Sequence, residues 1–260
     1  MKSFFKILAV AVLLSANARA SVDYSYVGPG LADGSGGIQV TFPTDYVGGS
    51  HSESGIYVGQ LHMSNPLDGA NFNAFCLSPG GLLTPGPAAY NVLTLDQAKY
   101  GMNPAAWSLT GGIENAAYIW AQKNQTISTA AEGAALNLAM WAALYNSTAV
   151  GALVGSDRFS VSGASAEIQQ AFAADIAQIN AASQSAILSN YSADPGYILR
   201  PVNPTMQDLI VLPGAVPESM QAQLAPEPST VFGLAILGLF VAGQMVAENL
   251  RRAPLLGGAR

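Results

Sequence analysis

Two apolar stretches, one near each end of the 260-residue sequence, leave only the middle of the chain to build a water-soluble fold. Near the N-terminus, Lys2 and Lys6 flank a short apolar run at 7–14, and Ala18-Arg19-Ala20 follows as an A-x-A pattern. This arrangement is typical of a secretory signal peptide, and the apolar run is shorter than the roughly 20 residues that span a bilayer. We therefore expect residues 1–20 to form a signal peptide that is removed after Ala20.

The second apolar stretch, at residues 231–247, is interrupted only by Gln244. At the helical rise it spans about 25 Å, near the lower limit for crossing a membrane. Arg251 and Arg252 follow it, as expected of a cytoplasmic basic flank. The sequence predicts a C-terminal transmembrane helix at 231–247 and a short cytoplasmic tail at 253–260.

Pro226 and Pro228 keep the segment before this predicted helix extended. Proline lacks an N–H and disfavours helix in the residue before it. Residues 226–252 together resemble the PEP-CTERM sorting signal, which combines this segment, an apolar helix and a basic pair. The resemblance implies export through the Sec translocon, transient anchoring in the inner membrane, and processing by an exosortase. It further implies a place at the cell surface or outside the cell in a bacterium that makes exopolysaccharide, a possible partner. The motif residues are Pro226, Glu227, Pro228, Ser229 and Thr230.

The middle of the chain is acidic. Residues 21–228 hold fifteen Asp and Glu but only four basic residues, Lys99, Lys123, Arg158 and Arg200. Binding to a phosphate backbone depends on Lys and Arg, so the composition argues against nucleic acid as a partner. We expect one extracytoplasmic domain at 21–212 and a linker at 213–225.

Hydrophobic periodicity predicts an α+β fold, in which a small antiparallel β-sheet packs with about three helices. Alternating or apolar runs predict strands at 38–42, 55–64, 71–77, 90–95 and 207–212. Helical spacing predicts helices at 113–123, 130–145 and 165–187. Thr129 and Glu132 fit a capping box at the start of the second helix. In the third helix, the residues expected to face inward are Ile168, Phe172, Ile176 and Ile179.

Two short motifs invite a chemical interpretation. On a helix, Asn137 and Trp141 lie one turn apart on one face, so a buried Trp141 would bury the Asn137 amide, which then needs partners. The pairs Phe75-Cys76 and Asn137…Trp141 resemble the thioester domains of Gram-positive surface adhesins. In that family a Cys bonds to the Gln of a Gln-x-Ala-Ile-Trp helix motif, and Asn137 takes the place of that Gln here. The resemblance implies a thioester-domain-like fold and a possible bond between Cys76 and Asn137.

Cys76 is the chain's single cysteine, and three interpretations of it stay open. In the first interpretation, Cys76 is a buried, inert thiol of the core, as most free cysteines are. Alternatively, it forms a thioester with Asn137 that acylates a surface nucleophile of a partner. The third interpretation is an intermolecular disulfide or another exposed-thiol role.

Other catalytic or metal-binding patterns are weak. His51 and His62 are the only histidines, and no cysteine or carboxylate cluster accompanies them, so we expect no metal site. No cofactor-binding fingerprint is present. We therefore expect a non-enzymatic surface or matrix protein. The alternatives are a covalent adhesin that uses Cys76 and Asn137 and, least favoured, an extracellular hydrolase.

Overall fold

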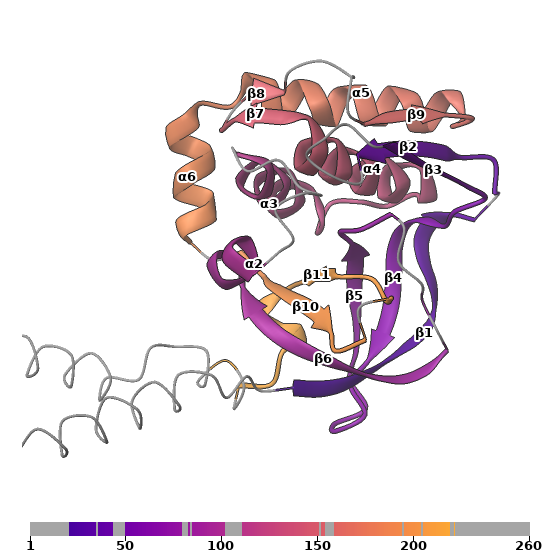
Figure 1. Ribbon diagram of the computed structural model, residues 1–260, viewed down its shortest axis with the longest axis vertical. Helices are drawn as coiled ribbons and strands as arrows, with labels where there is room; N and C mark the ends of the chain where they lie inside the picture. The colour runs from indigo at the N-terminus through magenta and orange to yellow at the C-terminus, as the bar shows by residue number, and fades with distance from the viewer. Residues whose placement is uncertain are drawn as a thin grey trace, which may run out of the picture. The chain divides into compact units, whose positions relative to one another are not determined.

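Six antiparallel strands close into a barrel in the computed structural model (Figure 1). Their order around the barrel is β1-β4-β5-β11-β10-β6, and β6 pairs with β1 to close it. The strands are β1 (Ser21–Asp33), β4 (Val58–Ser64), β5 (Asn71–Cys76), β6 (Gly86–Thr94), β10 (Tyr197–Pro201) and β11 (Leu209–Val211). The barrel therefore combines the first third of the domain with two strands from its C-terminal part.

The structure describes residues 21–34, 36–43, 50–79, 83, 85–101, 111–150, 152–153, 159–193, 195–203, 205–218 and 221. The described elements belong to a compact unit that ends at Pro217. The predicted signal peptide (1–20), sorting signal (226–252) and tail (253–260) lie outside the described residues.

The long strand β1 closes the barrel because it bends. Its residues 21–26 pair with β6, and its residues 25–33 pair with β4. The register shifts twice along β1, between Ser25 and Gly28 and between Pro29 and Ala32. Such irregularities bend a strand and increase its twist, which is what a closed barrel requires.

Two smaller sheets and five α-helices complete the described fold. One sheet has the order β3-β2-β9, with β2 (Gln39–Pro43), β3 (Ser50–Ser54) and β9 (Ser160–Ser162); the other pairs β7 (Ser147–Ala149) with β8 (Ala152–Leu153). The helices are α2 (Leu95–Gly101), α3 (Gly112–Lys123), α4 (Ala130–Asn146), α5 (Ala166–Ala181) and α6 (Gln184–Ser192). A 3₁₀ turn at Pro213–Ala215 follows β11, the last strand of the barrel.

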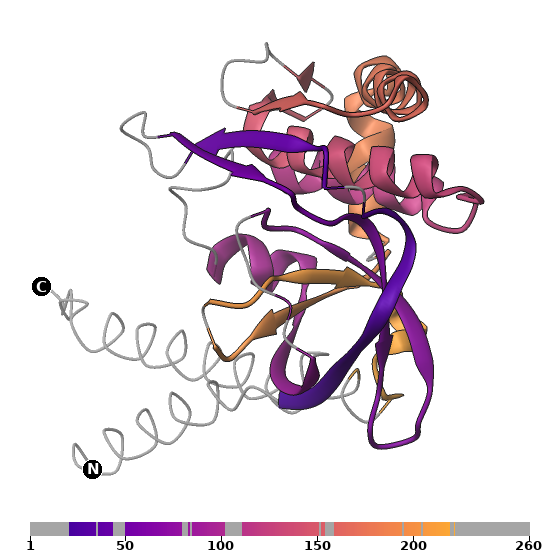
Figure 2. The same ribbon diagram turned by 90° about the vertical axis from the view of Figure 1, so that its right-hand side faces the viewer.

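Helix α4 is the centre of the helical layer (Figure 2). It begins with the predicted capping box: the Thr129 hydroxyl accepts from the Glu132 N–H, and the Glu132 carboxylate accepts from the Thr129 N–H. Every residue from Gly133 to Asn146 is buried, because the helix packs on β1 and β4 of the barrel as well as on α3 and α5. A helix that is apolar around most of its circumference needs such cover on all sides.

The predicted fold class is wrong. The strands form a closed six-stranded antiparallel barrel rather than a small sheet in an α+β fold with about three helices. The closing strands β1 and β10 were not predicted. Gly28-Pro29-Gly30 interrupts the alternation of β1, and β10 closes the barrel by pairing with the distant β6 as well as with its neighbour β11. The helix predicted at 165–187 is two helices, separated at Ala182 and Ser183, and the Ser183 hydroxyl caps the second.

The same prediction included a C-terminal transmembrane helix. Among the described residues, no helix is long and apolar enough to cross a membrane. The segment at 231–247 lies outside them. The predicted linker at 213–225 begins within the compact unit, since Ala215 and Val216 are buried and the Tyr24 hydroxyl donates to the carbonyl oxygen of Ala215 at 3.3 Å.

Candidate functional site

The candidate site lies where strand β5 ends beneath helix α4. Cys76, the last residue of β5, is 1 % exposed. It pairs with Leu209 of β11, and the Leu77 N–H donates to the carbonyl oxygen of Asp208 at 2.8 Å. Because residues two apart on a strand share a face, Gln207 lies diagonally opposite Cys76 on the same face of this ladder.

The Cys76 thiol contacts the Gln207 side chain. The Sγ–H donates to Oε1 of Gln207. Gln207 is itself 8 % exposed, so the contact is sheltered from solvent. The sulfur therefore faces a carboxamide group in a buried contact.

Helix α4 holds the main chain of Cys76 from the other side. The Asn137 amide nitrogen donates to the Cys76 carbonyl oxygen at 2.8 Å, and the Trp141 indole N–H donates to the same oxygen at 2.9 Å. The two donors lie one helical turn apart, as their spacing predicts. They use both lone pairs of one carbonyl oxygen and so fix the end of β5 against the helix.

The Asn137 side chain also ties the helix to strand β4. Its Oδ1 accepts from the N–H of Gly59 at 3.0 Å. Gly59 has a φ of 135°, and a Cβ there would collide with Ala32 of the neighbouring strand β1. Glycine is thus required at this point, and the expectation that a buried Asn137 needs partners is confirmed.

The electrostatics of the site favour neutral groups. Burial raises the pKa of the Cys76 thiol well above its usual range, because a thiolate would be desolvated there. Burial also raises the pKa of Tyr57 and of Tyr90 to about 12, and both rings lie near enough to interact electrostatically with Cys76. The thiol therefore stays protonated at neutral pH.

Asp208, which lies between Gln207 and the start of β11, forms an ion pair with Arg200. Its Oδ1 lies 3.5 Å from Nε of Arg200 on the adjoining strand β10. Burial raises the pKa of the Asp208 carboxyl, and the Arg200 guanidinium offsets part of that increase. This pair anchors the beginning of β11 beside the Cys76–Gln207 contact.

The structure thus brings Cys76 and Asn137 together, but through the Cys76 carbonyl oxygen rather than its sulfur. The side chain that meets the sulfur, Gln207, was not singled out from the sequence. A signal for it exists: Gln207, Leu209 and Val211 alternate along one face, and the latter two are completely buried. A polar residue that continues a buried face calls for a specific partner.

The other candidates do not gather into a site. His51 bonds to Glu53 at 2.6 Å and His62 to Asn73 at 2.7 Å, in exposed positions. Within the described part of the chain, no group of three or more His, Cys, Asp or Glu is arranged to hold a metal ion.

Two carboxylates line a cleft of about 220 Å³ beside α5, an arrangement that the hydrolase alternative would need. Glu132, however, is used as the capping residue of α4, and Asp175 pairs with Lys123 at 3.3 Å. Both carboxylates thus have structural partners.

No protein-family model, curated protein or solved structure matches this chain.

Proposed function

We propose that this chain is an exported surface protein whose buried Cys76–Gln207 pair forms an internal thioester for covalent attachment to a partner. The observation that carries the proposal is the contact of the Cys76 sulfur with the Gln207 carboxamide in a buried site. Nucleophilic attack needs the reacting atoms in close contact and held there. The double hydrogen bond of Asn137 and Trp141 to the Cys76 carbonyl supplies such a hold.

The bond-forming step is an exchange of amide for thioester. The Cys76 sulfur attacks the carboxamide carbon of Gln207, a C–S bond forms, and the C–N bond breaks. The thiol proton leaves with the nitrogen as ammonia, so no oxidant or reductant takes part. The proton travels with the leaving group, so both reactant and product are neutral, as a buried site that disfavours charge requires.

The resulting thioester is an acyl donor. A neutral amine of a partner, such as a lysine side chain, attacks the Gln207 carbonyl carbon, the C–S bond breaks, and an amide joins the two proteins while the thiol of Cys76 is restored. Burial of both residues slows hydrolysis of the bond, and the amine reaches it from the side of Gln207, which at 8 % is the more exposed of the two. A surface protein with this chemistry binds its partner covalently without turning over a substrate.

The terminal segments support a surface location for this chemistry. We propose that residues 1–20 direct export through the Sec translocon, and that the apolar segment at 231–247 holds the chain in the inner membrane. An exosortase then processes it at Pro226-Glu227-Pro228. Fractionation with mass mapping of the mature termini tests this part. We expect a start at Ser21 and an end near Pro228; a full-length chain in the cytosol, still bearing Met1 and Arg260, would contradict it.

Intact-mass measurement tests the thioester. Loss of ammonia lowers the mass by about 17 Da relative to the processed sequence, and Cys76→Ala should abolish the loss. One isosteric variant and peptide mapping identify the acyl residue. Gln207→Glu lacks the amide leaving group and should show the unmodified mass, and mapping of the wild-type protein should find the peptides that contain Cys76 and Gln207 joined. An unmodified wild-type mass would refute the bond, and a Cys76 peptide joined to the peptide that contains Asn137 would assign the bond to Asn137.

A further inference from the structure

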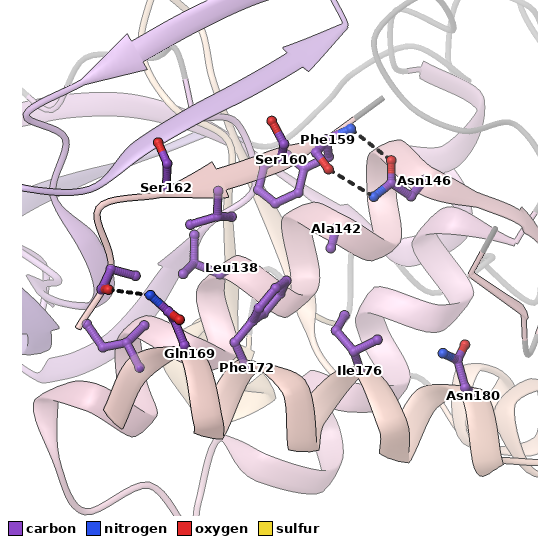
Figure 3. A pocket seen from close by; sticks show the side chains of 13 residues that line it. Leu138, Ala142, Asn146, Phe159, Ser160, Ser162, Gln169, Phe172, Ile176 and Asn180 are labelled. Carbon is purple, nitrogen blue, oxygen red and sulfur yellow. Dashed lines mark hydrogen bonds between the residues drawn. The ribbon is translucent and has the colours of Figure 1, made fainter. Parts of the chain in front are cut away.

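Helix α5 carries a row of side chains that the core uses only in part. Ile168, Phe172, Ile176 and Asn180 are spaced four residues apart and so share one face. Ile168 is buried, but Phe172 and Ile176 are only half-buried. Together the four residues form one wall of a groove with a volume of about 660 Å³ (Figure 3).

The opposite wall of the groove is strand β9. Ser160, Val161 and Ser162 all line it, although successive side chains of a strand point to opposite faces. The groove therefore runs along the edge of β9 rather than beneath one of its faces. The other edge of β9 pairs with β2, and among the described residues β9 is an outer strand of its sheet.

The floor of the groove belongs to α4. Leu138 and Ala142 line it, and each follows by one residue a side chain that holds Cys76. One residue corresponds to a turn of about 100° around a helix, so the groove lies on another face of α4 than the thiol site. Figure 3 shows Phe172 and Ile176 pointing from α5 into the space in front of this floor.

We propose that this groove binds an extended, uncharged peptide segment of a partner protein, which adds as a further strand to β9. From Ile168 to Asn180 the wall is about 18 Å long, which matches five or six residues of extended chain. An outer strand directs backbone N–H and C=O groups outward, and an added strand satisfies them, whereas a purely apolar small molecule does not.

The lining also sets the side chains that the peptide presents. The groove residues, all in the described part of the chain, include no Lys, Arg, Asp or Glu, so a charged side chain would lose its hydration without a counterion. Leu138, Phe172 and Ile176 favour small and medium apolar side chains at alternate positions. This site is independent of the thioester chemistry proposed for Cys76 and Gln207.

Hydrogen exchange of the full chain in lipid nanodiscs tests the proposal. The probe is a pool of capped five-residue peptides built from Ala, Val, Leu, Ile and Thr. We expect the pool to slow amide exchange at Ser160–Ser162 in the wild-type protein, a readout that needs no variant. Peptides retained by the protein on ultrafiltration are then identified by mass, and their dissociation constants are measured.

Two matched variants on α5 test the location. Phe172→Glu places a carboxylate in the groove and should weaken binding of the retained peptides at least tenfold. Ala173→Glu adds the same charge to the exposed neighbouring position and should leave binding within about twofold. Thermal unfolding of both variants verifies that they remain folded.

Three results would overturn the proposal. The first is a peptide pool that neither protects β9 nor is retained. The second is binding that Phe172→Glu leaves unchanged. The third is occupation of the groove by something else. One such result is Phe172-dependent binding of the neutral dye N-phenyl-1-naphthylamine without any peptide binding. The other is a dimer of the chain that Phe172→Glu dissociates.

Discussion

The two faces of helix α4 differ in what covers them. Toward the barrel, Asn137 and Trp141 are completely buried and each hydrogen-bonds to the end of strand β5. Toward α5, Leu138 and Ala142 are also buried, at 0 % and 3 % exposed, but they form the floor of an open groove. Burial of a residue therefore does not reveal its role, because the first face is closed around a polar contact whereas the second borders an open groove.

The largest effect is expected on the barrel face, at Trp141. Trp141→Ala removes a buried ring and one of the two donors to the Cys76 carbonyl, and should lower the free energy of unfolding by about 4 kcal/mol. Urea denaturation measures this loss. An effect below about 1 kcal/mol would mean that the barrel face is not the closed, well-packed side of α4.

A smaller loss in the free energy of unfolding is expected at Asn137, because its side chain contributes mainly through hydrogen bonds and less through the volume it fills. Asn137→Leu keeps most of the volume but leaves the Gly59 N–H without its acceptor and removes a donor from the Cys76 carbonyl. We expect a loss of about 2 kcal/mol, because an unsatisfied buried group keeps its desolvation penalty. A fully stable variant would show that the two bonds contribute little to holding β5.

The groove face should tolerate truncation better. Phe172→Ala removes a half-buried ring and should cost about 1.5 kcal/mol, well below the Trp141 value. Urea denaturation measures both losses, so their ratio shows how differently the two faces of α4 are packed. Equal losses would indicate that the groove is part of the tightly packed core.

The smallest effect concerns the cap that starts α4 and belongs to neither face. Thr129→Ala removes the hydroxyl that accepts from the Glu132 N–H, and should cost about 1 kcal/mol in the unfolding free energy. Thermal or urea unfolding near neutral pH measures it. No change would mean that the Glu132 half of the box suffices.

The cap also carries a pH dependence. Hydrogen bonds from Ser128, and then from Thr129, hold the pKa of the Glu132 carboxyl below its ordinary value. A lowered pKa in the folded state stabilises the fold above the ordinary Glu pKa of about 4.3, and this contribution is lost as the pH falls through the lowered value. Glu132→Gln should therefore remove part of the decline in stability on acidification, seen as a shallower pH profile.

Local signals in the sequence predicted the elements better than their assembly. The Thr129–Glu132 box set the start of α4, and the spacing of Asn137 and Trp141 predicted their common face. The closure of the barrel could not be predicted in the same way. It depends on pairings such as Val22 with Tyr90 and Leu199 with Val92, which join segments far apart in the chain and leave no local pattern.

The chemical pair illustrates the same limit. Cys76 and Asn137 stood out as unusual residues in apolar surroundings, yet the sulfur's partner is Gln207, 131 residues further along. That contact exists only because β11 pairs with β5 and places Gln207 diagonally across from Cys76. Asn137 shares the neighbourhood but is used to position the backbone.

Peptide mapping after treatment with methylamine tests for the thioester between Cys76 and Gln207. Methylamine opens a thioester and leaves a methylated amide on the acyl residue, about 14 Da heavier than the original carboxamide. We predict this increment on the peptide that contains Gln207, together with a newly alkylatable thiol at Cys76, and neither in Cys76→Ala. A wild-type protein with no methylamine increment, or with the increment at Asn137 instead, would contradict the account.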